Sequence, residues 1–332
     1  MSPTTQSATL DDVRLSAKRI FDLVSPELQL VEEEFERQAR SNIQVIAYMG
    51  EYLQRSGGKR VRPALAILSN YTVGGDGGNQ SSIRMATVME FLHTATLVHD
   101  DVIDKAETRR NRRSINAEFD NQTAVLMGDW LYMSAFETSL QERSLEVLDI
   151  LTAVTRKMTE GELLQLTLIG RADVTEEQYS DILRRKTAYL FSACCEIGAI
   201  LGGADEGERA ALREYGMSLG VAFQLVDDLL DFTSSEEVLG KPAGADLLEG
   251  KVSLPLIFLL QRNPEMRTAI QTVIADGSYA RVSRDSLLTR LDESGALALA
   301  HERAIEYAEA ARASLDGLNG SPHADALRSI PT

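Results

Sequence analysis

The feature that most limits the fold of this chain is a helical periodicity that continues almost from end to end. Apolar residues recur at intervals of three and four over most of the 332 positions, which places them on one face of an α-helix. Glycine (23) and proline (8) are sparse and aromatic residues make up only 6%, so the composition favours helices over sheets. We predict an all-α protein with helices over residues 10–39, 42–55, 60–72, 81–105, 117–140, 143–169, 175–202, 206–233, 250–262 and 297–316.

Some of these segments are apolar on most faces, namely residues 81–99, 188–201 and 216–232. Helices of that kind belong at the centre of a bundle, with amphipathic helices around them. Because no linker is long enough to separate two domains, we predict one domain over residues 1–332, a bundle of about ten or more helices. The polar ends, residues 1–9 and 320–332, are expected to be poorly ordered.

The charge and the cysteines exclude some classes of protein. Lys and Arg total 34 and Asp and Glu total 50, so the net charge is 34 − 50 = −16, which argues against nucleic acid as a partner. Cys194 and Cys195 are adjacent in an apolar helical stretch, and we interpret both as small, reduced core residues. With neither a signal-peptide pattern nor an apolar run long enough for a transmembrane segment, we expect a cytoplasmic protein.

Two aspartate clusters carry the strongest chemical signal, and each follows an apolar helical run. Residues 100–104 have the string DDVID and residues 227–231 have DDLLD. On a helix, i and i+4 share a face and i+1 lies about 100° away, so each cluster should present two carboxylates forward and one on the flank. The six acids are Asp100, Asp101, Asp104, Asp227, Asp228 and Asp231.

Such a concentration of carboxylates needs a counter-charge, and oxygen ligands without His or Cys favour magnesium over zinc or iron. A single cluster could be an acidic helix end in solvent, but two copies after long apolar runs weaken that interpretation. A di-iron bundle would need two Glu-x-x-His motifs, which the sequence does not supply.

Basic residues accompany both clusters. The segment from Gly57 to Arg62 has three cations at a glycine-opened helix start, where free backbone N–H groups also favour anions. Further cations are Arg109, Arg110, Arg112, Arg113, Lys186, Lys241 and Lys251. Each alone could be a solvated charge. Together with carboxylate-held magnesium, which usually binds a phosphate-bearing substrate, they predict a site for phosphate groups.

The two aspartate clusters and the basic segments, in the order in which they occur along the chain, resemble those of the trans-type isoprenyl diphosphate synthases. The resemblance is greatest to the long-chain, polyprenyl branch of that family. The resemblance runs from about Gly57 to Pro255, and only the ordered set is specific. The matching strings are GGKRVRP (57–63), FLHTATLVHDDVID (91–104), RR (109–110), GDWL (128–131), KT (186–187), FQLVDDLLD (223–231), GKPAGADL (240–247) and GKVSLP (250–255).

The resemblance implies a helical bundle around a large central cavity, a homodimer, and about three Mg²⁺ ions with substrate bound. It also implies the roles of residues. Asp100, Asp104 and Asp227 would ligand magnesium, supported by Asp101, Asp228 and Asp231. The allylic diphosphate would be held by Arg109, Lys186, Thr187, Gln224, Lys241 and Lys251, and isopentenyl diphosphate by Lys59, Arg60, Arg62, His93 and Arg110.

Two departures from the family pattern are visible, and His93 has a second, purely structural interpretation. Asn111 stands where the family often has Gly, at small cost because Asn tolerates a left-handed turn. The chain ends at Thr332 without the basic tail of many relatives, which puts a role for such a tail in doubt. His93 could also be a satisfied core histidine.

The implied chemistry is magnesium-assisted loss of diphosphate, attack by isopentenyl diphosphate on the allylic cation, and loss of a proton. Thr187 and Gln224 would stabilise the cation through their oxygen dipoles. The starter would be farnesyl or geranylgeranyl diphosphate.

Residues before the first cluster and after GDWL bear on product length. Ala95 and Thr96 are small where short-chain relatives carry aromatic rings, so the shaft below Asp100 should be open. We predict Phe136 as its floor and Leu92, Met89 and Tyr132 as walls, although each could be an ordinary core residue. The expected product is about C40, within roughly C30 to C45.

Three other functions remain as alternatives. The first is a geranylgeranyl (C20) diphosphate synthase. A terpene cyclase would replace the second Asp cluster with an Asn/Ser/Glu-type triad, and a non-catalytic partner subunit would be expected to lose Asp or Arg positions. In this sequence the second Asp cluster is present and the Asp and Arg positions are intact.

Overall fold

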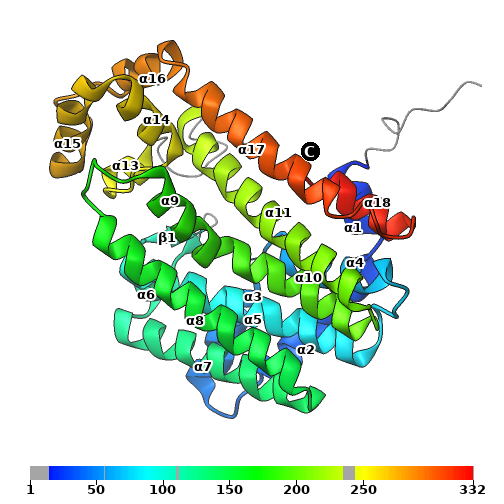
Figure 1. The fold of residues 1–332 in the computed structure, drawn as a ribbon. Coiled ribbons are helices and arrows are strands. Elements are labelled where there is room, and N and C mark those ends of the chain that lie inside the picture. Colours follow the sequence, from blue (N-terminus) through cyan, green and yellow to red (C-terminus); the bar gives the residue numbers. More distant parts are fainter. Residues whose placement is uncertain (1–14, 56, 110–111, 235–243, 332) are drawn as a thin grey trace, which may run out of the picture.

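The computed structural model describes residues 15–55, 57–109, 112–234 and 244–331, and the structure within these ranges is almost entirely helical (Figure 1). The strands in this part of the chain form a small antiparallel hairpin, in which β1 (Thr108–Arg109) pairs with β2 (Arg112–Arg113). The prediction of an all-α protein is confirmed. None of the described helices is both long enough and apolar enough to cross a membrane.

The middle of the bundle is built from two pairs of packed helices. In one pair α5 (Gln80–Ile103) lies against α7 (Asn121–Ser139), and in the other α10 (Tyr189–Leu201) lies against α11 (Glu206–Thr233). α4 (Val61–Thr72) connects the pairs by packing on both α5 and α10. Around them lie α1 (Ala17–Asp22), α2 (Ser25–Ala39), α3 (Gln44–Arg55), α6 (Ile115–Glu118), η2 (Leu140–Glu142), α8 (Leu145–Leu168), α9 (Glu176–Leu183) and the π-helical turn η3 (Arg184–Ala188).

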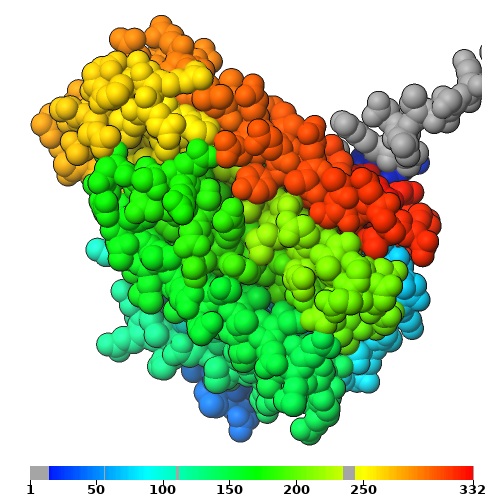
Figure 2. Space-filling view, viewed as in Figure 1, coloured from blue at the N-terminus to red at the C-terminus, as the bar shows by residue number. Residues whose placement is uncertain are grey.

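The C-terminal third forms a group of short helices at one end of the molecule, drawn yellow and orange in Figures 1 and 2. From this group α17 (Ala296–Ala313) returns along α11, and α18 (Pro322–Ser329) packs on α4. The short helices are α13 (Ala245–Leu248), α14 (Leu254–Arg262), η4 (Pro264–Met266), α15 (Arg267–Asp276) and α16 (Arg284–Glu293).

The core lies where the sequence predicts it. The N-terminal half of α5, nearly all of α10 and the middle of α11 are buried. α11 contributes to two apolar clusters: Tyr215 packs with the main bundle and Leu225 with the C-terminal helices. Cys194 and Cys195 are buried free thiols in α10, so their interpretation as core residues is confirmed.

The C-terminal end differs from the expectation. Poor order was predicted for residues 320–332, whereas the structure places a capped helix there, α18. The hydroxyl of Ser321 accepts the N–H of Ala324 at 3.0 Å, Leu327 is fully buried, and the Leu327 carbonyl accepts the hydroxyl of buried Tyr215 at 2.7 Å. Tertiary packing, not local periodicity, therefore orders this short helix. Residues 1–9 lie outside the described residues.

Some helix boundaries also differ from the prediction. The segment 10–39 is broken between α1 and α2, and the segment 250–262 becomes helical only at Leu254. The helices α15 and α16 are absent from the prediction because each is ten residues long and buries only two side chains, too few for a clear periodicity.

Candidate active site

A cavity of about 1950 Å³ opens between the central helices and collects most of the predicted site residues. The middle of α5 contributes one face, since Glu90, His93 and Leu97 are spaced by three or four, the repeat of one helix side. Toward its C-terminal end more of the helix lines the cavity, including His99, Asp100, Val102, Ile103 and the following Asp104. α7, α8, η3 and α11 line the other sides.

The first aspartate cluster has the predicted geometry. Asp100 and Asp104 line the cavity, while Asp101 lies on the flank, 3% exposed, with its Oδ1 2.6 Å from Arg109 Nε. Burial raises the pKa of Asp100 to about 7, and the nearby Glu162 carboxylate adds to the rise while Lys186 opposes it. Asp100 therefore lies where a further positive charge would stabilise its ionised form.

The second cluster is arranged differently from the expectation. Asp227 and Asp228 line the cavity, but Asp231 is 2% exposed and does not. Its Oδ2 accepts the backbone N–H of Asp246, at 3.4 Å, in α13. The side of α11 that meets the cavity passes through Gln224, Asp227 and Asp228, so the i+4 acid is turned toward the segment that follows the helix.

A chain of hydrogen bonds joins the second cluster to the Lys186–Thr187 motif. Thr187 Oγ1 donates to Gln224 Oε1 at 3.0 Å, and Gln224 Nε2 donates to Asp228 Oδ1 at 3.0 Å. Asp228 Oδ2 accepts the hydroxyl of Tyr179 at 2.6 Å. Burial raises the pKa of Asp228 to about 7, although the bonds from Tyr179 and Gln224 oppose the rise.

The described cations among those predicted to hold the allylic diphosphate each lie beside a carboxylate. Lys186 Nζ is 2.6 Å from Glu162 Oε1 and 2.9 Å from Gln165 Oε1. Lys251 Nζ is 3.2 Å from Asp104 Oδ2, and although burial lowers the pKa of Lys251, its carboxylate neighbours outweigh burial and raise it. Both lysines line the cavity. Lys241 lies outside the described residues.

The π-helical turn η3 explains how Lys186 and Thr187 both line the cavity. Neighbours on a regular α-helix point about 100° apart, whereas a π turn contains an additional residue and changes these directions. The turn packs closely on α8 at Gly161, where a Cβ atom would lie 2.7 Å from the Cβ of Arg185. Only glycine fits this contact without a shift of the turn.

Lys59, Arg60, Arg62 and His93 line the same cavity. Arg60 has φ 48° as the residue before α4 and pairs with Glu90 and with Glu32, whose Oε2 lies 2.9 Å from Nη2. It therefore ties the start of α4 to α5 and α2. The guanidinium of Arg62 lies 4.9 Å from the centre of the Phe191 ring. Arg110 and Asn111 lie outside the described residues.

The predicted chain-length residues fall into two groups. Thr96, Tyr132 and Phe136 line the cavity. Met89, Leu92 and Ala95 are fully buried and are not part of its lining. The sequence missed the apolar residues of α8 that complete this wall, among them Met158, Leu163 and Leu166.

Contacts at both ends of α5 and α7 show where Phe136 lies. His99 Nε2 is 3.1 Å from the Val125 carbonyl, and Arg84 pairs with Glu142 at the opposite end. The helices are therefore antiparallel, and Phe136 is level with the part of α5 around Glu90. This level is about ten residues, or about 15 Å of helix, from Asp100.

The donor set fits magnesium bound together with a phosphate group. Asp100 and Asp104 lie on α5 and Asp227 on α11, and they face one cavity. Within the described ranges, no three His, Cys, Asp or Glu side chains converge closely enough to hold an ion by themselves. Further oxygen donors are needed, and this agrees with Mg²⁺ coordination in proteins, where waters and substrate phosphates usually complete the set of ligands.

Among the polar residues of this cavity that were not identified from sequence are Tyr179, Glu162 and His99. Tyr179 and Glu162 act on residues far away along the chain, so no local pattern marks them. His99 could have been noticed as the neighbour of Asp100. A Cβ on Gly128 would lie 2.2 Å from His99 Nε2, which explains the glycine of the GDWL string.

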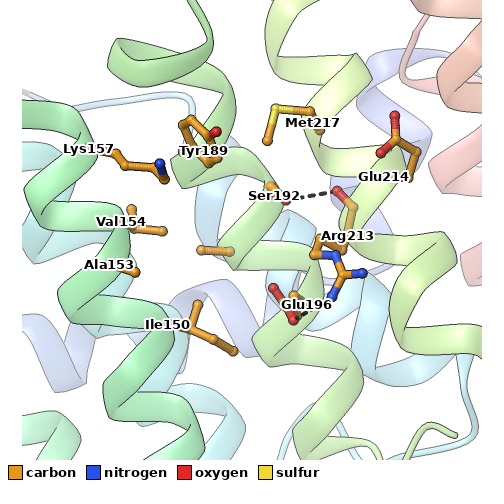
Figure 3. A pocket seen from close by; sticks show the side chains of 11 residues that line it. Ile150, Ala153, Val154, Lys157, Tyr189, Ser192, Glu196, Arg213, Glu214 and Met217 are labelled. Carbon is orange, nitrogen blue, oxygen red and sulfur yellow. Dashed lines mark hydrogen bonds and ion pairs between the residues drawn. The ribbon is translucent and has the colours of Figure 1, made fainter. Parts of the chain in front are cut away.

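A smaller cavity of about 310 Å³ lies between α8, α10 and α11 (Figure 3). Its walls are mainly apolar, with Lys157 over the Tyr189 ring at 4.8 Å. One acidic residue of this cavity, Glu196, lies 3.0 Å from Arg209 and 3.3 Å from Arg213. It contains none of the predicted site residues.

The fold and this site define a prenyltransferase of the all-helical class, and comparison with known proteins identifies the family. A family model described as polyprenyl synthetase matches residues 43–288, so the chain belongs to the polyprenyl synthetase family.

Individual relatives match over most of their length. Octaprenyl diphosphate synthase of Escherichia coli (strain K12) is 38% identical over 314 residues, covering 94% of this chain and 96% of the relative. Geranylgeranyl diphosphate synthase of Methanosarcina mazei is 35% identical over 284 residues, 84% and 86% of the two chains. The crystal structure of a polyprenyl synthase from Caulobacter crescentus CB15, complexed with calcium and isoprenyl diphosphate, has a TM-score of 0.90 at 33% identity and covers 96% of this chain and 97% of its own.

Proposed function

We propose that the protein condenses an allylic diphosphate, farnesyl or geranylgeranyl diphosphate, with successive molecules of isopentenyl diphosphate to make an all-trans polyprenyl diphosphate of about C40. The observation that carries this proposal is the arrangement in one cavity of two aspartate clusters, flanking cations and a long apolar wall. The first two suit a magnesium diphosphate, and the third suits a growing hydrocarbon chain.

Asp100, Asp104 and Asp227 are the proposed magnesium ligands, with about three ions when substrate is bound. Bound magnesium would neutralise the leaving diphosphate and so assist cleavage of the C–O bond. The relative crystallised with calcium and isoprenyl diphosphate supports the binding of a divalent cation together with a diphosphate. Lys186, Lys251 and Arg109 would bind diphosphate oxygens, and an ion bound to Asp104 would release Lys251 from that carboxylate.

The remaining chemistry depends on position and on exclusion of water. Thr187 and Gln224 line the cavity next to Lys186 and Asp227, so they would face the allylic carbon as positive charge develops. Lys59, Arg62 and His93 would hold isopentenyl diphosphate, and Arg60 would fix the start of α4. The departing diphosphate is the strong base nearest to the proton that must leave.

The depth of the cavity bears on the length of the product. An isoprene unit has four backbone bonds and spans about 4–5 Å when extended, so about 15 Å between Asp100 and the level of Phe136 holds about three units. Three units make a C15 tail, so a tail confined to this run would be extended once more and would give the C20 alternative. A longer tail has room between α7 and α8, where Met133 and Leu163 line the cavity and are nevertheless 61% and 60% exposed.

The same surface supports a homodimer of single-domain subunits. Leu126, Met133, Leu145 and Leu163 of α7 and α8 are each at least 60% exposed, and several large exposed apolar side chains on neighbouring helices are typical of an interface. A second copy of the chain over this face would keep a long product away from water.

The proposal is tested by incubating the purified protein with Mg²⁺, an allylic starter and labelled isopentenyl diphosphate, and then sizing the products. Elongation of the starter is expected in the presence of magnesium. Cyclised hydrocarbon from the starter alone, or no product with any starter, would contradict it.

A further inference from the structure

Tyr179 of α9 is a buried tyrosine whose hydroxyl donates a hydrogen bond to the second aspartate cluster. None of the sequence motifs includes this tyrosine. We propose that Tyr179 is a positioning residue that, through Asp228, holds the side chains of Gln224 and Thr187 in the orientation required for ionisation of the allylic substrate. This inference rests on the proposed function, because it assigns a role within that reaction.

The geometry is a continuous line of three hydrogen bonds from α9 to the cavity wall. Tyr179 donates to Asp228 Oδ2 at 2.6 Å, and Gln224 Nε2 donates to Asp228 Oδ1 at 3.0 Å. Gln224 Oε1 then accepts the hydroxyl of Thr187 at 3.0 Å. Each bond is short enough to fix the orientation of the next group.

The direction of these bonds follows from the carboxylate at their centre. A carboxylate only accepts hydrogen bonds, so the NH₂ end of Gln224 must face Asp228 and the carbonyl end must face Thr187. The proton of the Thr187 hydroxyl is thereby directed at Gln224. The lone pairs of that oxygen are left for the cavity, where they can stabilise positive charge.

Tyr179 is suited to hold this line in place because it is itself fixed. It is 6% exposed, and its α9 begins with a capping box in which Thr175 and Gln178 bond reciprocally. The backbone of Leu254, at the start of α14, also lies close to the Tyr179 hydroxyl. Without that hydroxyl, Asp228 Oδ2 would lose its donor, and the carboxylate could rotate and release the amide of Gln224.

The first test is Tyr179→Phe, which removes the hydroxyl and keeps the ring that packs in the core. We expect kcat to fall by about 10-fold or more, the usual effect of losing a group that orients a site residue. The KM for isopentenyl diphosphate should be unchanged, because its proposed ligands lie on α4 and α5. Tyr215→Phe is the matched control: it also removes a buried hydroxyl, bonded to Leu327 O at 2.7 Å, and should leave kcat unchanged.

A double-mutant cycle separates positioning from general loosening of the fold. If Tyr179 acts through Gln224, then Tyr179→Phe should lower kcat in the wild type but have little further effect in Gln224→Leu. Melting temperatures measured on all four proteins show whether each is folded. An unchanged kcat in Tyr179→Phe, or additive losses in the double variant, would overturn the inference. Failure of the wild type to elongate any starter would instead overturn the proposed function, and the inference with it.

Discussion

Replacement of Gly161 by alanine should disturb Lys186 more than it disturbs the fold. Gly161 lies in α8 where that helix meets the π turn η3, and a Cβ atom there would lie 2.7 Å from the Cβ of Arg185 and 3.1 Å from the backbone nitrogen of Lys186. Real Cβ atoms do not approach so closely, so the turn must move away from α8. The movement would separate Lys186 from Glu162, with which it now pairs at 2.6 Å.

Opposing terms make the expected cost in stability small. Overpacking costs about 1–3 kcal/mol, whereas alanine in place of glycine inside a helix gains about 1 kcal/mol, so the net loss should be about 0–2 kcal/mol. The functional cost should be larger. A hydrogen bond to a charged group is worth about 1.5–3 kcal/mol, so loss of the Lys186 contact to the allylic diphosphate should lower kcat/KM for that substrate by about 10- to 100-fold.

The assay is a comparison of denaturant unfolding with steady-state kinetics in both substrates. Gly207→Ala is the matched control, because Gly207 is an exposed helical glycine in the first turn of α11 and far from the cavity lining. It should keep full activity. If Gly161→Ala retains wild-type kcat/KM for the allylic substrate, or loses activity only in proportion to unfolding, the account of the α8–η3 contact is refuted.

Four further predictions follow from single contacts. Asp104→Asn should raise the Mg²⁺ concentration needed for half-maximal activity by at least about tenfold, and chelation of Mg²⁺ should abolish wild-type elongation; magnesium-independent activity would contradict both. Phe136→Ala should lengthen the product by at least one C5 unit, since one helical turn, about 5.4 Å, is opened, whereas Leu131→Ala, in the core of the same helix, should leave the length unchanged. Tyr215→Phe should cost about 1–2 kcal/mol of unfolding free energy by removing a buried hydrogen bond, and an unchanged denaturation midpoint would argue against it. Burial lowers the pKa of His323 in the folded state. The stability that the neutral side chain contributes is therefore fully present above the unfolded pKa of about 6.5 and is lost as the pH falls. The melting temperature should drop more on acidification in the wild type than in His323→Gln.

The sequence was sufficient where local pattern decides the structure. The long helices follow from apolar spacing, and the placing of Asp100 and Asp104 on one side of α5 follows from the i, i+4 rule. The same rule did not settle α11, because it relates residues to each other but does not say which side of the helix meets the cavity. Asp231 shares a side with Asp227 and is nevertheless turned toward Asp246.

What the sequence could not supply is long-range contact. α5 is apolar nearly all round, so periodicity could not distinguish Thr96, which lines the cavity, from Ala95, which is packed in the core. Tyr179 lies 49 residues from Asp228 in the chain, and its role is visible only once α9 and α11 are packed together. The helix α18 is equally a product of packing, since its eight residues are too few to be stable alone.

Product length is the most direct test of the central claim, that this cavity elongates an allylic diphosphate beyond the short-chain range. The purified protein is incubated with Mg²⁺, farnesyl diphosphate and labelled isopentenyl diphosphate, and the hydrolysed products are sized. Products near C40 are predicted, with the tail extending between α7 and α8 beyond the straight run that ends at Phe136. Products that stop at C20 would contradict the long-chain claim and confine the tail to the straight run above Phe136, and no elongation at all would contradict the proposed reaction.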